Sequence, residues 1–299
     1  MIKDFINQEK HSFPLSLLKD SCENDNQEIV YLKDALQSIH KQAGILPCAI
    51  GKSIDGYFFF DLAQAHHVLI AGDTGAGKSV LLHSIILSLL YRKRPDKLQF
   101  VFIDPKKVEF GAYNRIGNYL ANIKGVPSKV ITDTIEAMAV LEALCDEADR
   151  RYLLLLNAWA RSFEEYNRQP DHSRLPHIVV VIDEYADLMF MYGQAFESKI
   201  RKLSYVDNFG IHLIITTQRP TVSAITGCIK ANFVTRIAFR VAREFDSIVI
   251  LDGKEATDLS CAGDMVYSER NTCVRLRGTY VSEQDIEKVT KYIESNYVE

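Results

Sequence analysis

Residues 72–79 read GDTGAGKS and lie between an apolar run at residues 67–71 and an amphipathic stretch that begins at residue 77. The octet satisfies the pattern GxxxxGK[ST], in which glycines let the backbone curl around phosphate groups ahead of a helix N-terminus. A strand, this loop and a helix in that order predict an α/β fold of the P-loop NTPase type. The residues predicted to bind the nucleotide are Gly72, Asp73, Thr74, Gly75, Ala76, Gly77, Lys78 and Ser79.

Two side chains of this loop have predicted roles in nucleotide chemistry. Lys78 is expected to reach the β and γ phosphates, and Ser79 is expected to ligate magnesium. The predicted cofactors are therefore ATP and Mg²⁺. The alternative interpretation, a glycine-rich turn without a ligand, is disfavoured because a strand precedes the loop and a helix follows it.

Three further apolar runs, at residues 99–103, 178–182 and 211–217, are typical of buried strands. Helical periods separate them, the longest at residues 133–158, where Asp133 and Glu136 resemble a capping box. Alternating strands and helices predict a mostly parallel sheet with helices on both faces. A turn-rich segment near residue 50 suggests a small N-terminal helical appendage at residues 1–50, including a helix at 28–42, and a main domain at residues 51–299.

Two carboxylates follow the apolar run at residues 178–182, where open α/β sheets place ligands. Asp183 is predicted to join Ser79 in the magnesium shell, and Glu184 to polarise the attacking water. Gln218 follows the run at residues 211–217 and is a candidate sensor of the γ-phosphate. A charged pair that merely ends a strand is the alternative. The extra strand at residues 99–103 and the adjacent acids resemble the RecA-like branch of P-loop ATPases.

The net charge of −4 disfavours a broadly basic nucleic-acid surface, but the charge is unevenly distributed. Residues 199–243 contain eight basic side chains and one acid, Asp207, and so carry +7. This asymmetry indicates a basic face, although a solvated surface without a partner would look the same. No apolar stretch reaches the roughly 20 residues of a membrane span, and no secretory signal is evident, so we expect a cytoplasmic protein. Six scattered cysteines without a CxxC pair predict thiols and no zinc site.

Several segments together resemble one family. HVLIAGDTGAGKSVLLHSIILSLLY, FVFIDPKKVEF, EADRRYLLL, LPHIVVVIDEYADLM, GIHLIITTQRPTVSAITGCIKANFVTRIAF and GDMVY occur in this order. They are similar to the motor domain of FtsK/SpoIIIE DNA translocases over about residues 45–290. The resemblance implies an ATPase that forms a hexameric ring and moves double-stranded DNA through its centre, with a possible membrane-anchored or conjugation partner.

The resemblance also implies roles for basic residues. Arg236, and secondarily Arg219, are candidates for the arginine finger that reaches a neighbouring subunit's nucleotide. The residues expected to contact DNA phosphates from pore loops are Lys230, Arg240 and Arg243.

The chain also departs from the family pattern. Ile248 occupies a position where family members usually carry arginine, which puts the interface chemistry in doubt. The region before the motor is short, and no winged-helix module follows, so septum anchoring and directional sequence reading are not expected of this chain. An FtsK/SpoIIIE-like ATPase that drives protein secretion is the alternative function. A scaffold that binds ATP without turnover is a third, disfavoured because Glu184 supplies a water-polarising acid.

Overall fold

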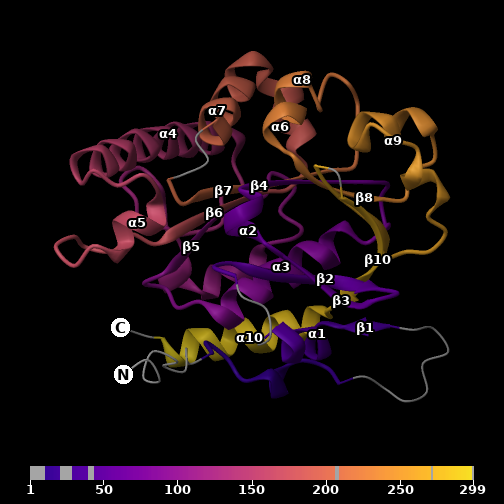
Figure 1. Ribbon diagram of the computed structural model, residues 1–299, viewed down its shortest axis with the longest axis horizontal. Helices are drawn as coiled ribbons and strands as arrows, with labels where there is room; N and C mark the ends of the chain where they lie inside the picture. Colours follow the sequence, from indigo (N-terminus) through magenta and orange to yellow (C-terminus); the bar gives the residue numbers. More distant parts are fainter. Residues whose placement is uncertain (1–10, 21–28, 40–43, 206–208, 271, 298–299) are drawn as a thin grey trace.

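The computed structural model describes residues 11–20, 29–39, 44–205, 209–270 and 272–297. Most of the acidic segment at residues 20–28, both ends of the helix predicted at 28–42, and Asp207 lie outside these ranges. Within them, one sheet has the strand order β3-β2-β10-β9-β8-β4-β7-β6-β5 (Figure 1). Two layers of helices enclose it.

The parallel half of the sheet contains the four predicted strands, whose residues are buried except for partly buried Gln99. Near-continuous apolar runs are what strands covered on both faces require. A fifth strand, β8, joins them beside β4. The bounds are β4 His67–Ala71, β5 Leu98–Ile103, β6 His177–Ile182, β7 Ile211–Thr217 and β8 Thr235–Phe239.

An antiparallel half continues the sheet beyond β8. Its strands are β9 Asp264–Glu269, β10 Thr272–Tyr280, β2 Pro47–Ser53 and β3 Gly56–Asp61. The short strand β1 Val30–Tyr31 pairs with β10 in parallel. The predicted parallel sheet is thus the half that carries the phosphate loop. Strand β2 runs through residue 50, and the division into an appendage and a main domain stays a prediction.

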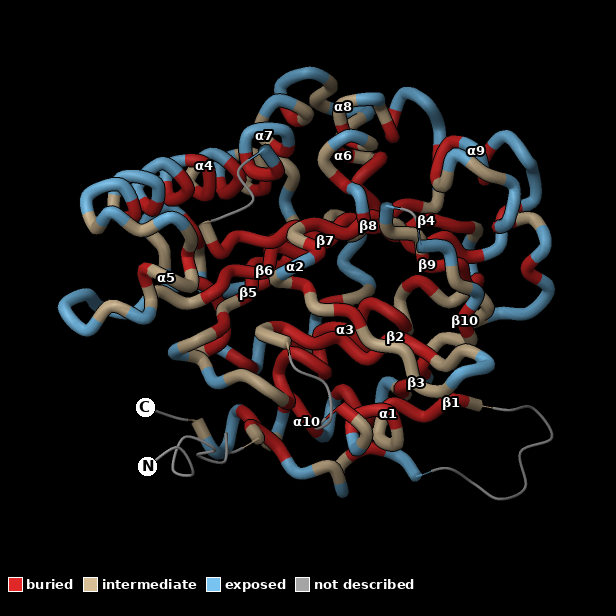
Figure 2. The backbone as a smooth tube through the Cα atoms, viewed as in Figure 1, coloured by how far each residue is buried: buried red, intermediate tan, exposed pale blue. Residues whose placement is uncertain are grey.

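Helices cover both faces of the sheet, as predicted (Figures 1 and 2). One face packs against α4 Thr134–Asn157, α6 Tyr185–Tyr192, α7 Gln194–Tyr205, α8 Gly227–Asn232 and α9 Glu244–Leu251. The other packs against α3 Lys78–Arg92, α1 Leu32–Ser38 and α10 Glu283–Asn296. The shorter helices are α2 Leu62–Ala65, α5 Phe163–Arg168 and the 3₁₀ turns Leu15–Leu17, Gly111–Arg115, Gly117–Tyr119 and Glu255–Asp258.

Local signals set the ends of the long helices. The Asp133 carboxylate accepts hydrogen bonds from the backbone N–H groups of Ile135 and Glu136, which caps α4. Ser282 and Asp285 form a reciprocal capping box at the start of α10. Among the described residues, none of the helices combines the length and apolarity needed to cross a membrane.

Candidate active site

The phosphate loop follows β4 and leads into α3, so the middle of the sheet positions it. Gly77 caps α3 with φ of 118°, a left-handed conformation that favours glycine. Gly72 also has positive φ, and a Cβ there would fall 2.6 Å from Cβ of Phe239 on neighbouring β8. These two glycines let the backbone turn tightly against β8, as the sequence motif requires.

The loop presents donors toward its own centre. The Lys78 Nζ donates to the carbonyl oxygens of Gly72 and Asp73, both at 2.7 Å, so the ammonium lies across the loop. Burial lowers the pKa of Lys78, and Glu184 and Asp183 partly offset this effect. Within the described chain, the backbone N–H groups of Gly75 and Gly77 make no recorded hydrogen bond. Backbone N–H groups that lie beside a lysine at the start of a helix are the arrangement that binds phosphate.

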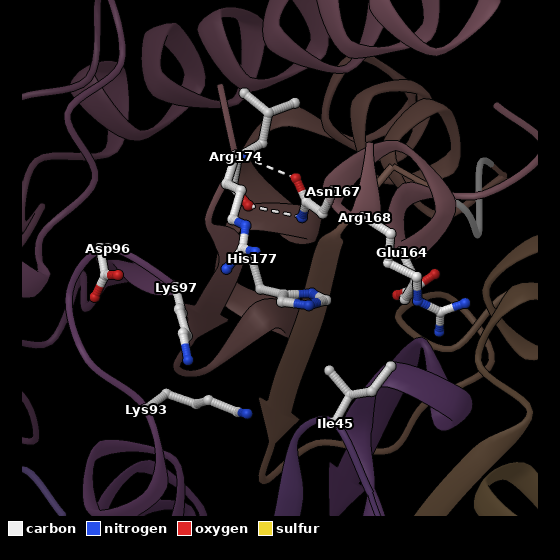
Figure 3. A pocket seen from close by; sticks show the side chains of 10 residues that line it. Ile45, Lys93, Asp96, Lys97, Glu164, Asn167, Arg168, Arg174 and His177 are labelled. Atoms are coloured by element: carbon white, nitrogen blue, oxygen red, sulfur yellow. Dashed lines mark hydrogen bonds between the residues drawn. The ribbon is translucent and has the colours of Figure 1, made fainter. Parts of the chain in front are cut away.

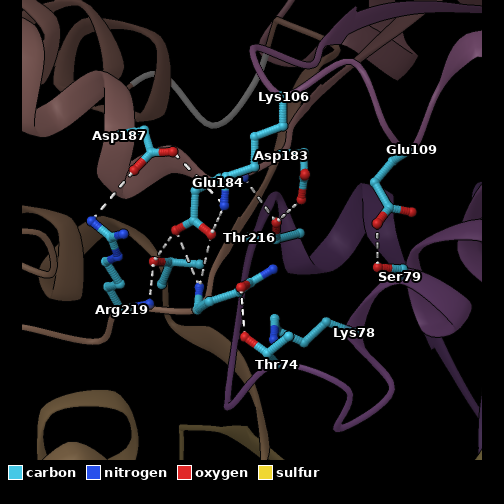
Figure 4. A network of polar contacts seen from close by, with 12 residues as sticks. Thr74, Lys78, Ser79, Lys106, Glu109, Asp183, Glu184, Asp187, Thr216 and Arg219 are labelled. Atoms are coloured by element: carbon cyan, nitrogen blue, oxygen red, sulfur yellow. Dashed lines mark hydrogen bonds and ion pairs between the residues drawn. The ribbon is translucent and has the colours of Figure 1, made fainter.

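The Ser79 side chain donates one short hydrogen bond near the loop, and the Asp183 side chain accepts one. The Ser79 hydroxyl donates to Glu109 Oε1 at 2.7 Å, and the Thr216 hydroxyl donates to Asp183 Oδ1 at 2.6 Å (Figure 4). Burial raises the pKa of Asp183, Thr216 counteracts it, and the nearby carboxylates add to the increase. A hydroxyl and a carboxylate oxygen form a donor set that suits Mg²⁺.

Glu184 is buried, with only 2 % of its side chain exposed, and its backbone has φ of 45°. A left-handed glutamate directly after a strand is strained, and such strain concentrates at functional sites. Lys106 Nζ donates to Oε2 at 2.8 Å, and the Thr217 hydroxyl donates to Oε1 at 3.0 Å. Burial alone would lower the pKa of Lys106, but the hydrogen bond and charge of Glu184 outweigh it and raise that pKa.

Gln218 connects the acid pair to the phosphate loop. Its backbone N–H lies 3.2 Å from Glu184 Oε1, and its side-chain Oε1 accepts from the Thr74 hydroxyl at 2.7 Å. The sequence predicted Gln218 beside the γ-phosphate position but did not predict this bridge. The structure therefore brings Thr74, Gln218 and Glu184 into one hydrogen-bonded network at the carboxyl ends of the strands, with Lys78 close enough to feel the charge of Glu184 (Figure 4).

The candidate arginine fingers differ in accessibility. Arg236 is 14 % exposed and binds Asp252 at 2.7 Å, as well as the backbone carbonyls of Phe233 and Lys230. Its guanidinium would have to leave these contacts to reach a neighbouring subunit. Arg219 is 74 % exposed and lies 3.8 Å from Asp187, so it is the freer of the two. The finger assignment stays a prediction.

Most of the predicted DNA contacts are paired with acids. Lys230 forms an ion pair with Asp252, and Arg243 forms one with Asp246 at 2.8 Å. Arg240 is exposed, and in the described part of the chain it makes no recorded ion pair. Much of the +7 stretch is therefore neutralised locally by acids, and the role of these three residues in DNA binding stays a prediction.

Ile248, which occupies the position of the usual family arginine, is 39 % exposed on α9, and its backbone carbonyl accepts from Lys230.

A family model described as the FtsK/SpoIIIE family matches residues 32–222. The chain belongs to the FtsK/SpoIIIE family. The DNA translocase FtsK of Helicobacter pylori J99 is 39 % identical over 281 residues, which cover 91 % of this chain and 32 % of that protein. The DNA translocase FtsK of Campylobacter jejuni serotype O:2 is 42 % identical over 279 residues, which cover 90 % of this chain and 29 % of that protein. The chain thus spans about a third of the length of these relatives.

Solved structures agree on the fold. The pCW3 conjugation coupling protein TcpA, in a monomer form with ATPγS, superposes with a TM-score of 0.73 at 28 % identity, covering 93 % of this chain and 74 % of that one. The cytoplasmic domain of the type VII secretion ATPase EccC of Thermomonospora curvata superposes with a TM-score of 0.70 at 23 % identity. The match covers 83 % of this chain and 31 % of that one. The predicted family and the P-loop α/β fold are both confirmed.

Two cavities flank the sheet of this FtsK/SpoIIIE-family chain. One, of about 310 Å³, adjoins the phosphate loop and is lined by Gly75, Val80, Arg277 and Tyr280 among others. The other, of about 390 Å³, lies at the opposite, amino ends of β5 and β6, where Lys93, Lys97, Arg174 and His177 surround it (Figure 3). Only the first is contiguous with the phosphate loop, so it is the candidate space for the rest of a nucleotide.

Sequence reasoning assigned no role to Lys106 or Glu109, which both lie in the loop after β5. Both residues lie in the segment FVFIDPKKVEF, and one feature of the sequence could have indicated that they contact the site. The loop leaves the carboxyl end of a parallel strand, the same edge that carries Ser79 and Glu184. Charged residues in such a loop are candidates for contact with the site.

Proposed function

We propose that this chain hydrolyses ATP with Mg²⁺ and uses the energy to move double-stranded DNA. The observation that supports hydrolysis is the position of Glu184. It is a buried carboxylate that follows β6, linked through Gln218 to the phosphate loop. A protein that only binds ATP needs no such acid. The DNA substrate is inferred from DNA translocases that are about 40 % identical over nine-tenths of this chain.

The residues divide the work as follows. The loop N–H groups and Lys78 bind the β and γ phosphates, and in doing so Lys78 exchanges the carbonyls of Gly72 and Asp73 for phosphate oxygens. Ser79 and Asp183 hold Mg²⁺, which supplies charge neutralisation at the phosphates. Glu184 accepts the proton of the attacking water and orients it, and Gln218 contacts the γ-phosphate through the side chain that now binds Thr74. The cavity beside Val80 and Tyr280 receives the base and sugar.

We also propose a cytoplasmic homo-oligomer, a hexameric ring, in which an arginine from one subunit stabilises charge at its neighbour's nucleotide. Arg219 fits this role better than Arg236 because it is exposed and weakly paired. Arg243 and Lys230 would bind DNA phosphates after exchanging their acidic partners for the DNA backbone, and exposed Arg240 would bind them directly. A membrane-anchored or conjugation protein is a candidate partner.

The test compares ATP turnover with and without duplex DNA at low salt, across a range of protein concentrations. We expect stimulation that weakens as salt rises, because phosphate contacts release counterions. Sedimentation with ATP and DNA present tests the ring. Absence of stimulation at every protein concentration argues against a DNA motor.

The second candidate function is ATP-driven protein secretion, since a type VII secretion ATPase shares the fold. Stimulation of turnover by a peptide substrate, with no response to DNA, would favour this alternative. Both candidate functions use the same proposed ATP site. The experiment therefore distinguishes only whether DNA or a polypeptide is transported.

A further inference from the structure

Glu109 contacts the hydroxyl that is expected to bind magnesium, although it belongs to neither of the sequence motifs of the site. It lies in the loop after β5, 30 residues beyond Ser79, and its Oε1 accepts the Ser79 hydroxyl hydrogen at 2.7 Å. Its side chain is 21 % exposed. The contact is therefore long-range in sequence and largely shielded from water.

Two sets of contacts fix this carboxylate. Asp104 Oδ2, at the end of β5, accepts from the backbone N–H of Glu109 at 2.9 Å, which sets the course of the loop. The other carboxylate oxygen, Oε2, lies 3.5 Å from Nε2 of His83. His83 Nδ1 in turn lies 2.9 Å from the hydroxyl of buried Tyr113.

The helix α3 presents Ser79 and His83 on one side because they are four residues apart. Glu109 thus meets a helix face through both of its oxygens, one bound to Ser79 and the other near His83 (Figure 4 shows the contact with Ser79). Tyr113 stacks on Phe102 of β5 with ring centroids 5.0 Å apart, so the aromatic core supports this arrangement.

A serine hydroxyl that ligates a cation must direct a lone pair at the metal and its hydrogen elsewhere. An acceptor on the far side of the hydroxyl fixes that orientation, and an acceptor with negative charge also makes the oxygen a better ligand. The Glu109 carboxylate accepts the Ser79 hydroxyl hydrogen and carries a negative charge. Such outer partners commonly contribute 10- to 100-fold to metal affinity.

We propose that Glu109 is a positioning residue for the magnesium complex. It holds the Ser79 hydroxyl with a lone pair facing the cation, and His83 holds Glu109. This inference rests on the proposed function, because it assumes that Ser79 binds Mg²⁺ together with ATP.

The test measures nucleotide binding rather than turnover. A fluorescent ATP analogue is titrated onto the full chain first in EDTA and then at increasing Mg²⁺, with the Glu184→Gln change present throughout to prevent hydrolysis. Glu109→Gln removes the charge but keeps an acceptor oxygen, and Glu109→Ala removes both. Glu142→Gln, on exposed α4 surface, is the matched control.

We expect the affinity in EDTA to be the same in all variants. The Mg²⁺ concentration for half-maximal tightening should rise about tenfold in Glu109→Gln and further in Glu109→Ala, and should not change in Glu142→Gln. His83→Ala should shift it in the same direction by a smaller factor. A Glu109→Ala protein with unchanged or lower Mg²⁺ requirement would overturn the proposal. Failure of the parent protein to bind the analogue would instead contradict the proposed function.

Discussion

Lys106 restrains the acid that is expected to activate water. The Glu184 carboxylate receives Lys106 Nζ at 2.8 Å, the Thr217 hydroxyl at 3.0 Å and the Gln218 backbone N–H at 3.2 Å, and it is 2 % exposed. Three donors around a buried carboxylate leave little space for a water molecule. At least one of these contacts must yield before Glu184 can bind the nucleophile, and Lys106 is the most accessible donor.

The size of this restraint follows from the geometry. A hydrogen bond to a charged group contributes about 1.5–3 kcal/mol when shielded. The Lys106 side chain is 35 % exposed, so solvent screening reduces its contribution to about 1 kcal/mol. Removing the ammonium should therefore favour the water-binding arrangement by about fivefold. Because Thr217 and Gln218 remain, the carboxylate keeps two donors and the site keeps its shape.

The assay is steady-state ATP turnover by Lys106→Met without DNA, with Lys107→Met as the control because Lys107 is an exposed neighbour in the same loop. We expect kcat to rise about fivefold, KM for ATP to stay unchanged, and the factor of stimulation by DNA to fall correspondingly. A tenfold loss of kcat at unchanged KM would refute the reasoning, because Lys106 would then stabilise the reaction itself.

Three further outcomes are expected. Glu184→Gln should retain nucleotide affinity but lose turnover, whereas Lys78→Ala should weaken nucleotide binding itself; equal affinity in Lys78→Ala would refute the phosphate placement. Arg151 is 1 % exposed and bound to Glu147 at 2.8 Å, so Arg151→Met should lower the free energy of unfolding by about 3–5 kcal/mol in urea titrations. Burial lowers the pKa of His212 to about 3. The unfolded chain, with an ordinary pKa near 6.5, then binds more protons below that pH. The contribution of His212 to stability should fall by about 2 kcal/mol between pH 7 and 5, in addition to that of buried His67 and His177, and His212→Asn should reduce the slope.

The sequence predicted the parallel half of the fold because those strands are covered on both faces. An uninterrupted apolar run such as residues 178–182 is explained by a strand that is buried on both faces. The observed strand, β6, begins only one residue earlier than predicted. The antiparallel strands give no such signal. Strand β10 mixes exposed, partly buried and buried positions without a regular alternation along Thr272–Tyr280, and its two neighbours β9 and β2 lie far from each other in sequence. The β9–β10 and β2–β3 pairs are local hairpins, whereas the β10–β2 pair joins distant segments and depends on the fold as a whole.

The same distinction applies to the site. Lys78 and Ser79 are set by one local loop, so a motif of eight residues suffices to predict them. The Lys106–Glu184 contact joins residues 78 positions apart and exists because β5 lies beside β6. The Glu109–Ser79 contact joins residues 30 positions apart, between the loop after β5 and the first turn of α3. The spacing of these residues along the chain does not show that they lie close together in the fold. Arg236 illustrates the converse, since resemblance predicted an intersubunit role for a side chain that makes close contacts within its own chain.

The loop after β5 links both halves of the hydrolytic site. Lys106 contacts the acid that activates water, and three residues later Glu109 contacts the hydroxyl that is expected to ligate magnesium. Between them Val108 is 74 % exposed, so a surface segment connects two partly buried contacts. Asp104 Oδ2 accepts from the backbone N–H groups of Glu109 and Phe110, and the Asp104 carbonyl accepts from the Lys107 N–H at 3.1 Å. A displacement of residues 106–108 that breaks the Lys107 contact would release Glu184, while the Asp104 carboxylate still holds the backbone next to the Ser79 contact. The order of contacts along this loop therefore allows water activation to change without loss of the bound metal and nucleotide.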